Sequence, residues 1–99
     1  MLRHVVTLTL VDNTPQATAD VVVAEISALA QLVPSVQQLT VGVDVGVDAN
    51  NAQIGIVADF ADAGGYEEYR DHPDHRRVIV EHVRPVLASR SAVQFEFQP

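Results

Sequence analysis

The stretch RHVVTLTLV, residues 3–11, has the pattern of a strand that is covered on both sides. It is rich in β-branched residues, and successive side chains of a strand point to opposite faces of its sheet. The two faces would hold the following sets of residues: His4, Val6, Leu8 and Leu10 on one, and Val5, Thr7, Thr9 and Val11 on the other. Neither set is fully polar, so we expect protein to pack against both faces.

Helix and strand patterns follow this stretch in alternation. Apolar residues at spacings of three and four predict a helix over residues 15–33. Thr14 is expected to cap that helix, because its hydroxyl can accept a hydrogen bond from a free N–H group of the first turn. Alternating apolar residues then predict strands over residues 36–47 and 53–60. The polar link over residues 48–51 favours an antiparallel hairpin of these two strands.

A second helical region and a last strand complete the chain. Asp62 is suited to cap a helix that ends at His72, because the residue before a proline avoids helical backbone angles. A new helix is predicted from Pro73 to about Ser89, since proline is well tolerated at the first helical position. A short strand is predicted over residues 92–97.

This order of elements is strand, helix, strand, strand, helix, strand. It predicts an α+β protein with the ferredoxin-like split βαβ arrangement and an antiparallel sheet. At 99 residues the chain has the size of one domain, so residues 1–99 are expected to form a single domain. Two helices would cover one face of the sheet, and the other face would carry Val5, Thr7, Thr9, Gly55 and Val57. That face is too apolar to remain in water, and we therefore expect a homodimer that forms through it.

Charge and composition exclude several classes of function. The net charge is −7, from 13 acidic and 6 basic residues, whereas nucleic acids and anionic membrane surfaces are bound by clusters of Lys or Arg. We therefore expect no nucleic acid and no membrane as a partner. The chain has no cysteine, which excludes disulfides, a thiolate nucleophile and cysteine-based zinc sites. No apolar stretch approaches the ~20 residues of a membrane span, so a cytoplasmic location is expected.

Three segments of the chain resemble the stress-responsive dimeric α/β-barrel family, also called Dabb. They are His4 with the apolar strand that follows it, the segment YRDHPDH (residues 69–75), and the segment VRPV (residues 83–86). Together with Gly42 and residues 57–60, they extend the resemblance over essentially the whole chain. The resemblance implies that the open sheet faces of two subunits meet to form a dimeric α+β barrel. It also implies a small cavity between the sheet and the helices of each subunit.

The resemblance further implies a candidate active site. A plant polyketide cyclase that is similar to this family uses a histidine and a tyrosine for an aldol condensation. By that resemblance we expect His75 to act as the base, Tyr69 to hydrogen-bond it or the substrate carbonyl, and His4 to reach the cavity from the sheet. Imidazole and phenol suit this chemistry, because ring closure needs a base with a pKa near the working pH and a donor for the developing enolate. The residues expected to bind the ligand are Val6, Leu8, Ile26, Phe60, His72 and Ile79.

These features favour a cyclase or lyase of the polyketide-cyclase type that acts on a small carbonyl compound, with no cofactor and no metal ion. A metal site is disfavoured because Pro73 interrupts His72 and His75, whereas a chelating pair on a helix is normally four residues apart. The alternative is a non-catalytic stress-responsive dimer that binds a small apolar or aromatic ligand or has a structural role. A cofactorless oxygenase and an assembling interaction module are further possibilities.

Several of the candidate residues also have a purely structural interpretation. Tyr69 suits a core position, His72 suits the start of a helix, and His75 suits a surface position in a first helical turn. Ile54 stands where the plant cyclase has a second histidine, and the helix over residues 15–33 has no aromatic residue to line a cavity. These departures from the cyclase keep the non-catalytic alternative open.

Overall fold

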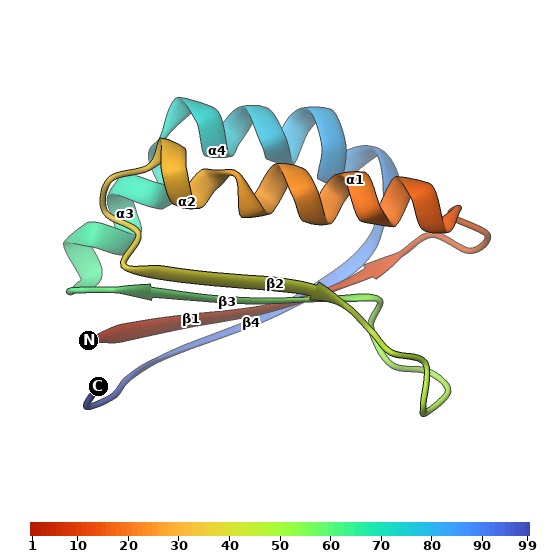
Figure 1. The fold of residues 1–99 in the computed structure, drawn as a ribbon, viewed down its shortest axis with the longest axis horizontal. Coiled ribbons are helices and arrows are strands. Elements are labelled where there is room, and N and C mark those ends of the chain that lie inside the picture. Colours follow the sequence, from red (N-terminus) through yellow and green to blue (C-terminus); the bar gives the residue numbers. More distant parts are fainter.

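The computed structural model describes every residue from Met1 to Pro99. It has a four-stranded sheet with all its helices on one face (Figure 1). The elements in chain order are β1 (Leu2–Leu10), α1 (Gln16–Ser27), α2 (Leu29–Leu32), β2 (Gln38–Val43), β3 (Ile54–Phe60), α3 (Ala63–Asp71), α4 (Pro73–Val78), the π-helical turn η1 (Ile79–Val83), the 3-10 turn η2 (Arg84–Val86) and β4 (Leu87–Glu96). The strand order is β2-β3-β1-β4, and each neighbouring pair is antiparallel. This is the ferredoxin-like α+β fold that the sequence predicts.

The register of β1 with its two neighbours determines which residues share a face. His4 of β1 pairs with Ala58 of β3 and with Gln94 of β4. Leu8 pairs with Arg90 of β4 in the same way. Residues that are directly opposite in an antiparallel pair point to the same face of the sheet. Gln94 and Arg90 therefore lie on the helix-covered face, which we call the inner face.

A single cluster of fifteen buried residues fills the space between the inner face and the helices. The sheet contributes alternate residues of β1 and β3, and the helices contribute residues such as Val22, Ile26 and Leu29. Alternation in the strands and spacings of three and four in the helices bring these residues to one layer.

The start of the first helix differs from the prediction. The predicted helix over residues 15–33 is divided into α1 and α2 at Ala28. Thr14 does not cap it, because the Thr14 hydroxyl donates to the carbonyl oxygen of Val11 at 2.6 Å. Pro15 occupies the cap position without a side-chain hydrogen bond.

The hairpin of β2 and β3 is confirmed as antiparallel, but β2 is shorter than the predicted strand over residues 36–47. Beyond Val43 the Asp44 carboxylate accepts hydrogen bonds from the backbone of Gly46 and from the side chain of Asn51. Gly46 has a φ of 80°, a conformation that glycine adopts at low cost. These contacts close a loop and end the strand, so Val45 is left 86% exposed.

The predicted break between α3 and α4 is confirmed. The Asp62 carboxylate caps α3 by accepting from the backbone N–H of Gly65 at 3.0 Å. His72 has an extended backbone, and its Nδ1 accepts from the backbone N–H of Asp74 at 3.1 Å, which caps α4. α4 begins at Pro73, as expected.

The end of the second helical region and the start of the last strand were predicted too late. In η1 the backbone N–H of Arg84 donates to the carbonyl of Ile79, five residues earlier, so the helix is widened. Pro85, which has no N–H to donate, follows in η2. The helical region therefore ends at Val86 rather than Ser89, and β4 begins at Leu87 rather than at residue 92.

The opposite face of the sheet has no helix over it, and we call it the open face (Figure 1). Val93 and Phe95 of β4 lie there, paired across the sheet with Val5 and Arg3. Their side chains are 57% and 45% exposed, respectively. The predicted apolar second face is thus present in the subunit. None of the helices is long and apolar enough to cross a membrane.

Candidate functional site

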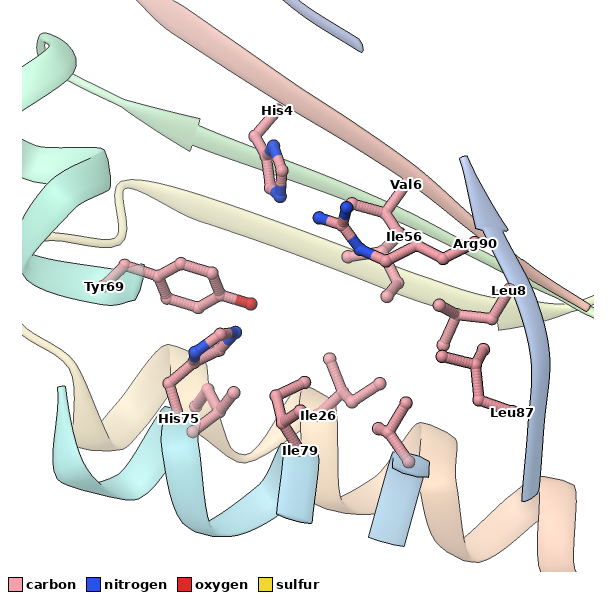
Figure 2. A pocket seen from close by; sticks show the side chains of 12 residues that line it. His4, Val6, Leu8, Ile26, Ile56, Tyr69, His75, Ile79, Leu87 and Arg90 are labelled. Atoms are coloured by element: carbon pink, nitrogen blue, oxygen red, sulfur yellow. The ribbon is translucent and has the colours of Figure 1, made fainter. Parts of the chain in front are cut away.

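A cavity of about 240 Å³ lies between the inner face and the helices (Figure 2). Its floor comes from β1, β3 and β4, and its other walls come from α1, α2, the α3–α4 region and η1. The cavity is lined by His4, Val6, Leu8, Ile26, Leu29, Ile56, Tyr69, His75, Ile79, Val83, Leu87 and Arg90. A π-helical turn in this wall is notable, because such turns occur frequently at functional sites.

The structure brings His4, Tyr69 and His75 together at this cavity. Four of the six expected ligand-binding residues line it as well: Val6, Leu8, Ile26 and Ile79.

Two of the expected lining residues lie elsewhere, which corrects that part of the prediction. Phe60 is fully buried at the end of β3, and its ring packs against Tyr66 and Tyr69 with centroid distances of 5.8 and 5.3 Å. It therefore supports Tyr69 from behind. His72 uses its ring to cap α4, so its Nδ1 is occupied by the backbone of Asp74.

Tyr69 and His75 are brought together by the break at His72. Tyr69 lies in the last turns of α3 and His75 in the first turn of α4, and their ring centroids are 4.4 Å apart. The Tyr69 hydroxyl, which makes no hydrogen bond within the protein, faces the cavity (Figure 2). Burial, assisted by the neighbouring Tyr66 and opposed by Arg90, raises the pKa of Tyr69 to about 12. The phenol therefore keeps its proton and can donate it in a hydrogen bond.

The hydrogen bond of His75 determines which of its nitrogens is free. Its Nδ1 lies 3.1 Å from the carbonyl oxygen of Arg70. A carbonyl oxygen can only accept, so Nδ1 carries the proton and Nε2 has a free lone pair in the neutral ring. Burial lowers the pKa of His75, as do the charges of Arg90 and Arg76, while the bond to the Arg70 carbonyl opposes the shift. The neutral ring is thus favoured, with a basic Nε2.

His4 has the opposite arrangement. The side-chain nitrogen of Gln94 lies 2.9 Å from Nδ1 of His4. An amide nitrogen can only donate, so Nδ1 accepts and the proton of the neutral ring is on Nε2. Burial, followed by the charges of Arg90 and His75, lowers the pKa of His4 to about 4. With only 4% of its surface exposed, His4 is a neutral ring that presents a donor at Nε2.

Sequence reasoning missed Gln94 and Arg90. Both lie on β4 and reach the inner face through their register with His4 and Leu8. The one signal that could have found them is strand pairing with β1, which requires the start of β4 to be known. The predicted strand over residues 92–97 leaves Arg90 outside and gives no register for Gln94.

The remaining histidine also has a structural partner. Nε2 of His82 in η1 lies 3.8 Å from Oε2 of Glu25 in α1. No group of three or more His, Asp or Glu side chains is arranged to hold a metal ion.

The protein thus belongs to the ferredoxin-like α+β structural class and has a cavity between its sheet and its helices. The sequence profile of the Stress responsive A/B Barrel Domain family (Dabb) matches residues 2–97, and the chain belongs to this family. No curated protein matches the sequence.

Solved structures with a similar fold include three informative cases. A dimeric ferredoxin-like protein of unknown function from Thermobifida fusca is 32% identical, with a TM-score of 0.87 over 97% of this chain and 90% of that chain. A hydroxynitrile lyase from Passiflora edulis is 17% identical, with a TM-score of 0.81 over 99% of this chain and 96% of that chain. An antibiotic biosynthesis monooxygenase is 14% identical, with a TM-score of 0.74 over 100% of both chains. The last two are alike in fold alone.

Proposed function

We propose that the cavity is the active site of a cofactor-independent cyclase or lyase that acts on a small, polyketide-like carbonyl compound. The observation that carries this proposal is that two histidines at one cavity have different partners at Nδ1, the Arg70 carbonyl oxygen for His75 and the Gln94 amide nitrogen for His4. His75 offers a lone pair at Nε2, and His4 offers a proton at Nε2. Tyr69 adds a second donor. A base with two hydrogen-bond donors is the set of groups that enolate chemistry requires.

The chemistry follows from these roles. Nε2 of His75 takes a proton from the carbon next to the carbonyl group, and the electrons of that C–H bond move toward the carbonyl oxygen. The developing negative charge on this oxygen accepts hydrogen bonds from Nε2–H of His4 and from the Tyr69 hydroxyl. The enolate carbon then attacks a second carbonyl carbon and forms the new C–C bond. The proton on His75 returns to the resulting alkoxide, and the reverse sequence cleaves such a bond.

The cavity suits a small substrate with an apolar body. An apolar cavity of about 150 Å³ is known to hold benzene, so a volume of about 240 Å³ accommodates an aromatic ring or a short chain with substituents. Most of the lining is aliphatic. Such walls exclude water and strengthen the hydrogen bonds to the oxygen that gains charge. That a hydroxynitrile lyase has the same fold agrees with a lyase or cyclase role.

We further propose that the protein works as a homodimer that forms through the open face. Val93 and Phe95 expose apolar surface there. Val93 pairs with Val5 of β1, which pairs in turn with Val57 of β3. Exposed apolar patches of this kind mark interfaces. The Thermobifida fusca protein, described as dimeric, supports this assignment.

Proton exchange tests the proposed activity without knowledge of the natural substrate. We expect the protein to accelerate deuterium incorporation at the methyl group of acetophenone in D₂O, followed by proton NMR. His75→Ala should abolish the acceleration, because His75 is the one histidine at the cavity that is assigned a free lone pair on Nε2. His82→Ala is the matched control, since His82 does not line the cavity. No acceleration by the unmodified protein, or equal acceleration by His75→Ala, would overturn the proposal and favour a non-catalytic ligand-binding dimer.

A further inference from the structure

Arg90 is the one charged side chain that lines the cavity when its two histidines are neutral. No aspartate or glutamate contributes to the lining. Arg90 lies opposite Leu8 in the sheet, so its side chain leaves β4 on the inner face. Its guanidinium extends into the space toward His4 (Figure 2). The residue as a whole remains exposed, which places it at the mouth of the cavity.

Arg90 has no partner within the protein. The chain contains six arginines, and four of them, Arg3, Arg70, Arg76 and Arg77, lie within 4 Å of a carboxylate. Arg90 takes part in no ion pair and in no side-chain hydrogen bond. A guanidinium without a carboxylate partner keeps all its N–H donors for an anionic group. An anionic ligand group would provide an ion pair.

The surface outside the cavity carries further arginines. An outer groove shares His75 and Ile79 with the cavity, and its other residues include Arg70, Arg76 and Arg84. Four of the six arginines of a chain with a net charge of −7 are thus gathered around the cavity and its outer side. Asp71 pairs with Arg70 and Arg76, so Arg84 and Arg90 are the two members without a carboxylate within 4 Å, and they can attract a small anion.

We infer that the cavity takes a small organic carboxylate, with its anionic group on Arg90 and its apolar body against the aliphatic wall. The planar guanidinium matches a carboxylate in a two-pronged hydrogen-bonded pair. The inference rests on the proposed function in one respect, because it takes the cavity to be the ligand site. It narrows the substrate class to carbonyl compounds that also carry a carboxylate, such as keto acids. Arg90 would hold the carboxylate while the carbonyl group faces His4 and Tyr69.

Benzoate and benzamide form a probe pair that isolates the charge. Both are planar, aromatic and of nearly equal size, and they differ in the group that would contact Arg90. Their dissociation constants are measured by titration in ¹H–¹⁵N correlation spectra. We expect benzoate to bind the unmodified protein about tenfold or more tightly than benzamide. The reason is that a hydrogen bond to a charged group contributes more binding free energy than a neutral one, and the difference corresponds to about tenfold in the dissociation constant. The largest shifts should involve β4 and the His75 region.

Two variants assign the preference to Arg90. Arg90→Gln should abolish the preference for benzoate, and Arg90→Lys should retain part of it, since lysine keeps the charge and loses the planar fork. Arg77→Gln is the matched control, because it removes one positive charge from the surface and Arg77 does not line the cavity. It should leave the preference unchanged.

The results separate this inference from the proposed activity. Equal binding of benzoate and benzamide to the unmodified protein, or an undiminished preference in Arg90→Gln, overturns the carboxylate inference even where acetophenone exchange is catalysed. A benzoate preference that depends on Arg90, in a protein that catalyses exchange in neither acetophenone nor the keto acid pyruvate, supports the carboxylate site and overturns the enzymatic proposal. Absence of binding by both compounds at millimolar concentration overturns the inference as well.

Discussion

The inner and open faces of the sheet are made by alternate residues of the same strands, and they differ in what covers them. On the inner face, His4, Val6 and Leu8 of β1 lie under helices and beside a cavity. On the open face, Val93 and Phe95 project from β4 with no cover from their own chain. Because successive side chains of a strand alternate, the same strands line the cavity on one face and form an apolar surface on the other. A substitution on one face should therefore leave the other face unchanged.

The largest effect is expected for a charge placed on the open face. Phe95→Asp should dissociate the proposed homodimer, because an unpaired charge in an apolar interface costs several kcal/mol. Val21→Asp is the matched control, since Val21 is 49% exposed and lies in α1, on the helix-covered side of the sheet. Sedimentation equilibrium measures the outcome. A dimer that survives Phe95→Asp, or an unmodified protein that is monomeric, would show that the open face is not the interface.

On the inner face, removal of the His4 donor should slow catalysis strongly. His4→Leu is expected to reduce the rate of acetophenone exchange by about 10²–10³-fold, the usual effect of losing one donor to a developing oxyanion. His4→Gln should recover part of the rate, because its side-chain amide can still donate. Gln94→Leu tests a positioning residue, and it should shift the His4 proton away from Nε2 in ¹⁵N spectra. Equal rates for His4→Leu and the unmodified protein would remove His4 from the mechanism.

The buried His4 should also make the stability of the subunit depend on pH. Its pKa is lowered from 6.5 to about 4, so its stabilising contribution is complete above pH 6.5 and is lost as the pH falls toward 4. The loss amounts to roughly 2 kcal/mol between pH 7 and pH 5 and roughly 3 kcal/mol in all. Urea unfolding at several pH values measures it. His4→Leu should flatten this part of the curve, and an unchanged slope would show that His4 is not the source.

A smaller effect is expected at the edge of the inner face, where α3 begins. Asp62→Ala removes the hydrogen bond to the backbone of Gly65. The expected cost is about 1 kcal/mol of unfolding free energy, typical for the loss of a helix cap. Asp48→Ala in the exposed loop after β2 is a suitable control. Equal midpoints of urea unfolding for the two variants would mean that the cap does not hold α3, and with it Tyr69, in place.

The sequence was sufficient for the order of the elements and for the inner side of β1, because strand alternation depends on local pattern alone. It placed Phe60 on the correct side of the sheet. Whether that ring meets the cavity or the core depends on Tyr66 and Tyr69, which pack over it. This is a tertiary contact that no periodicity contains.

The residues that could not be predicted are positioned by strand pairing or by a turn between helices, and the periodicity of their own segment does not show their place. The stretch from Ala88 to Ser91 has no apolar alternation, and it becomes part of β4 because it pairs with β1. Arg90 and Gln94 obtain their places from that register. The meeting of Tyr69 with His75 likewise depends on the turn between two helices, where helical spacing no longer applies.

The most direct test of the proposed acid–base pair is the protonation state of His4 and His75, read from long-range ¹H–¹⁵N spectra of the imidazole rings as a function of pH. We predict that both rings are neutral at pH 7 and are different tautomers, with the proton on Nε2 in His4 and on Nδ1 in His75. Both pKa values should lie below 6.5, with that of His4 near 4. Two rings of the same type, or titration of both near the ordinary pKa of 6.5, would contradict the assignment of one donor and one base.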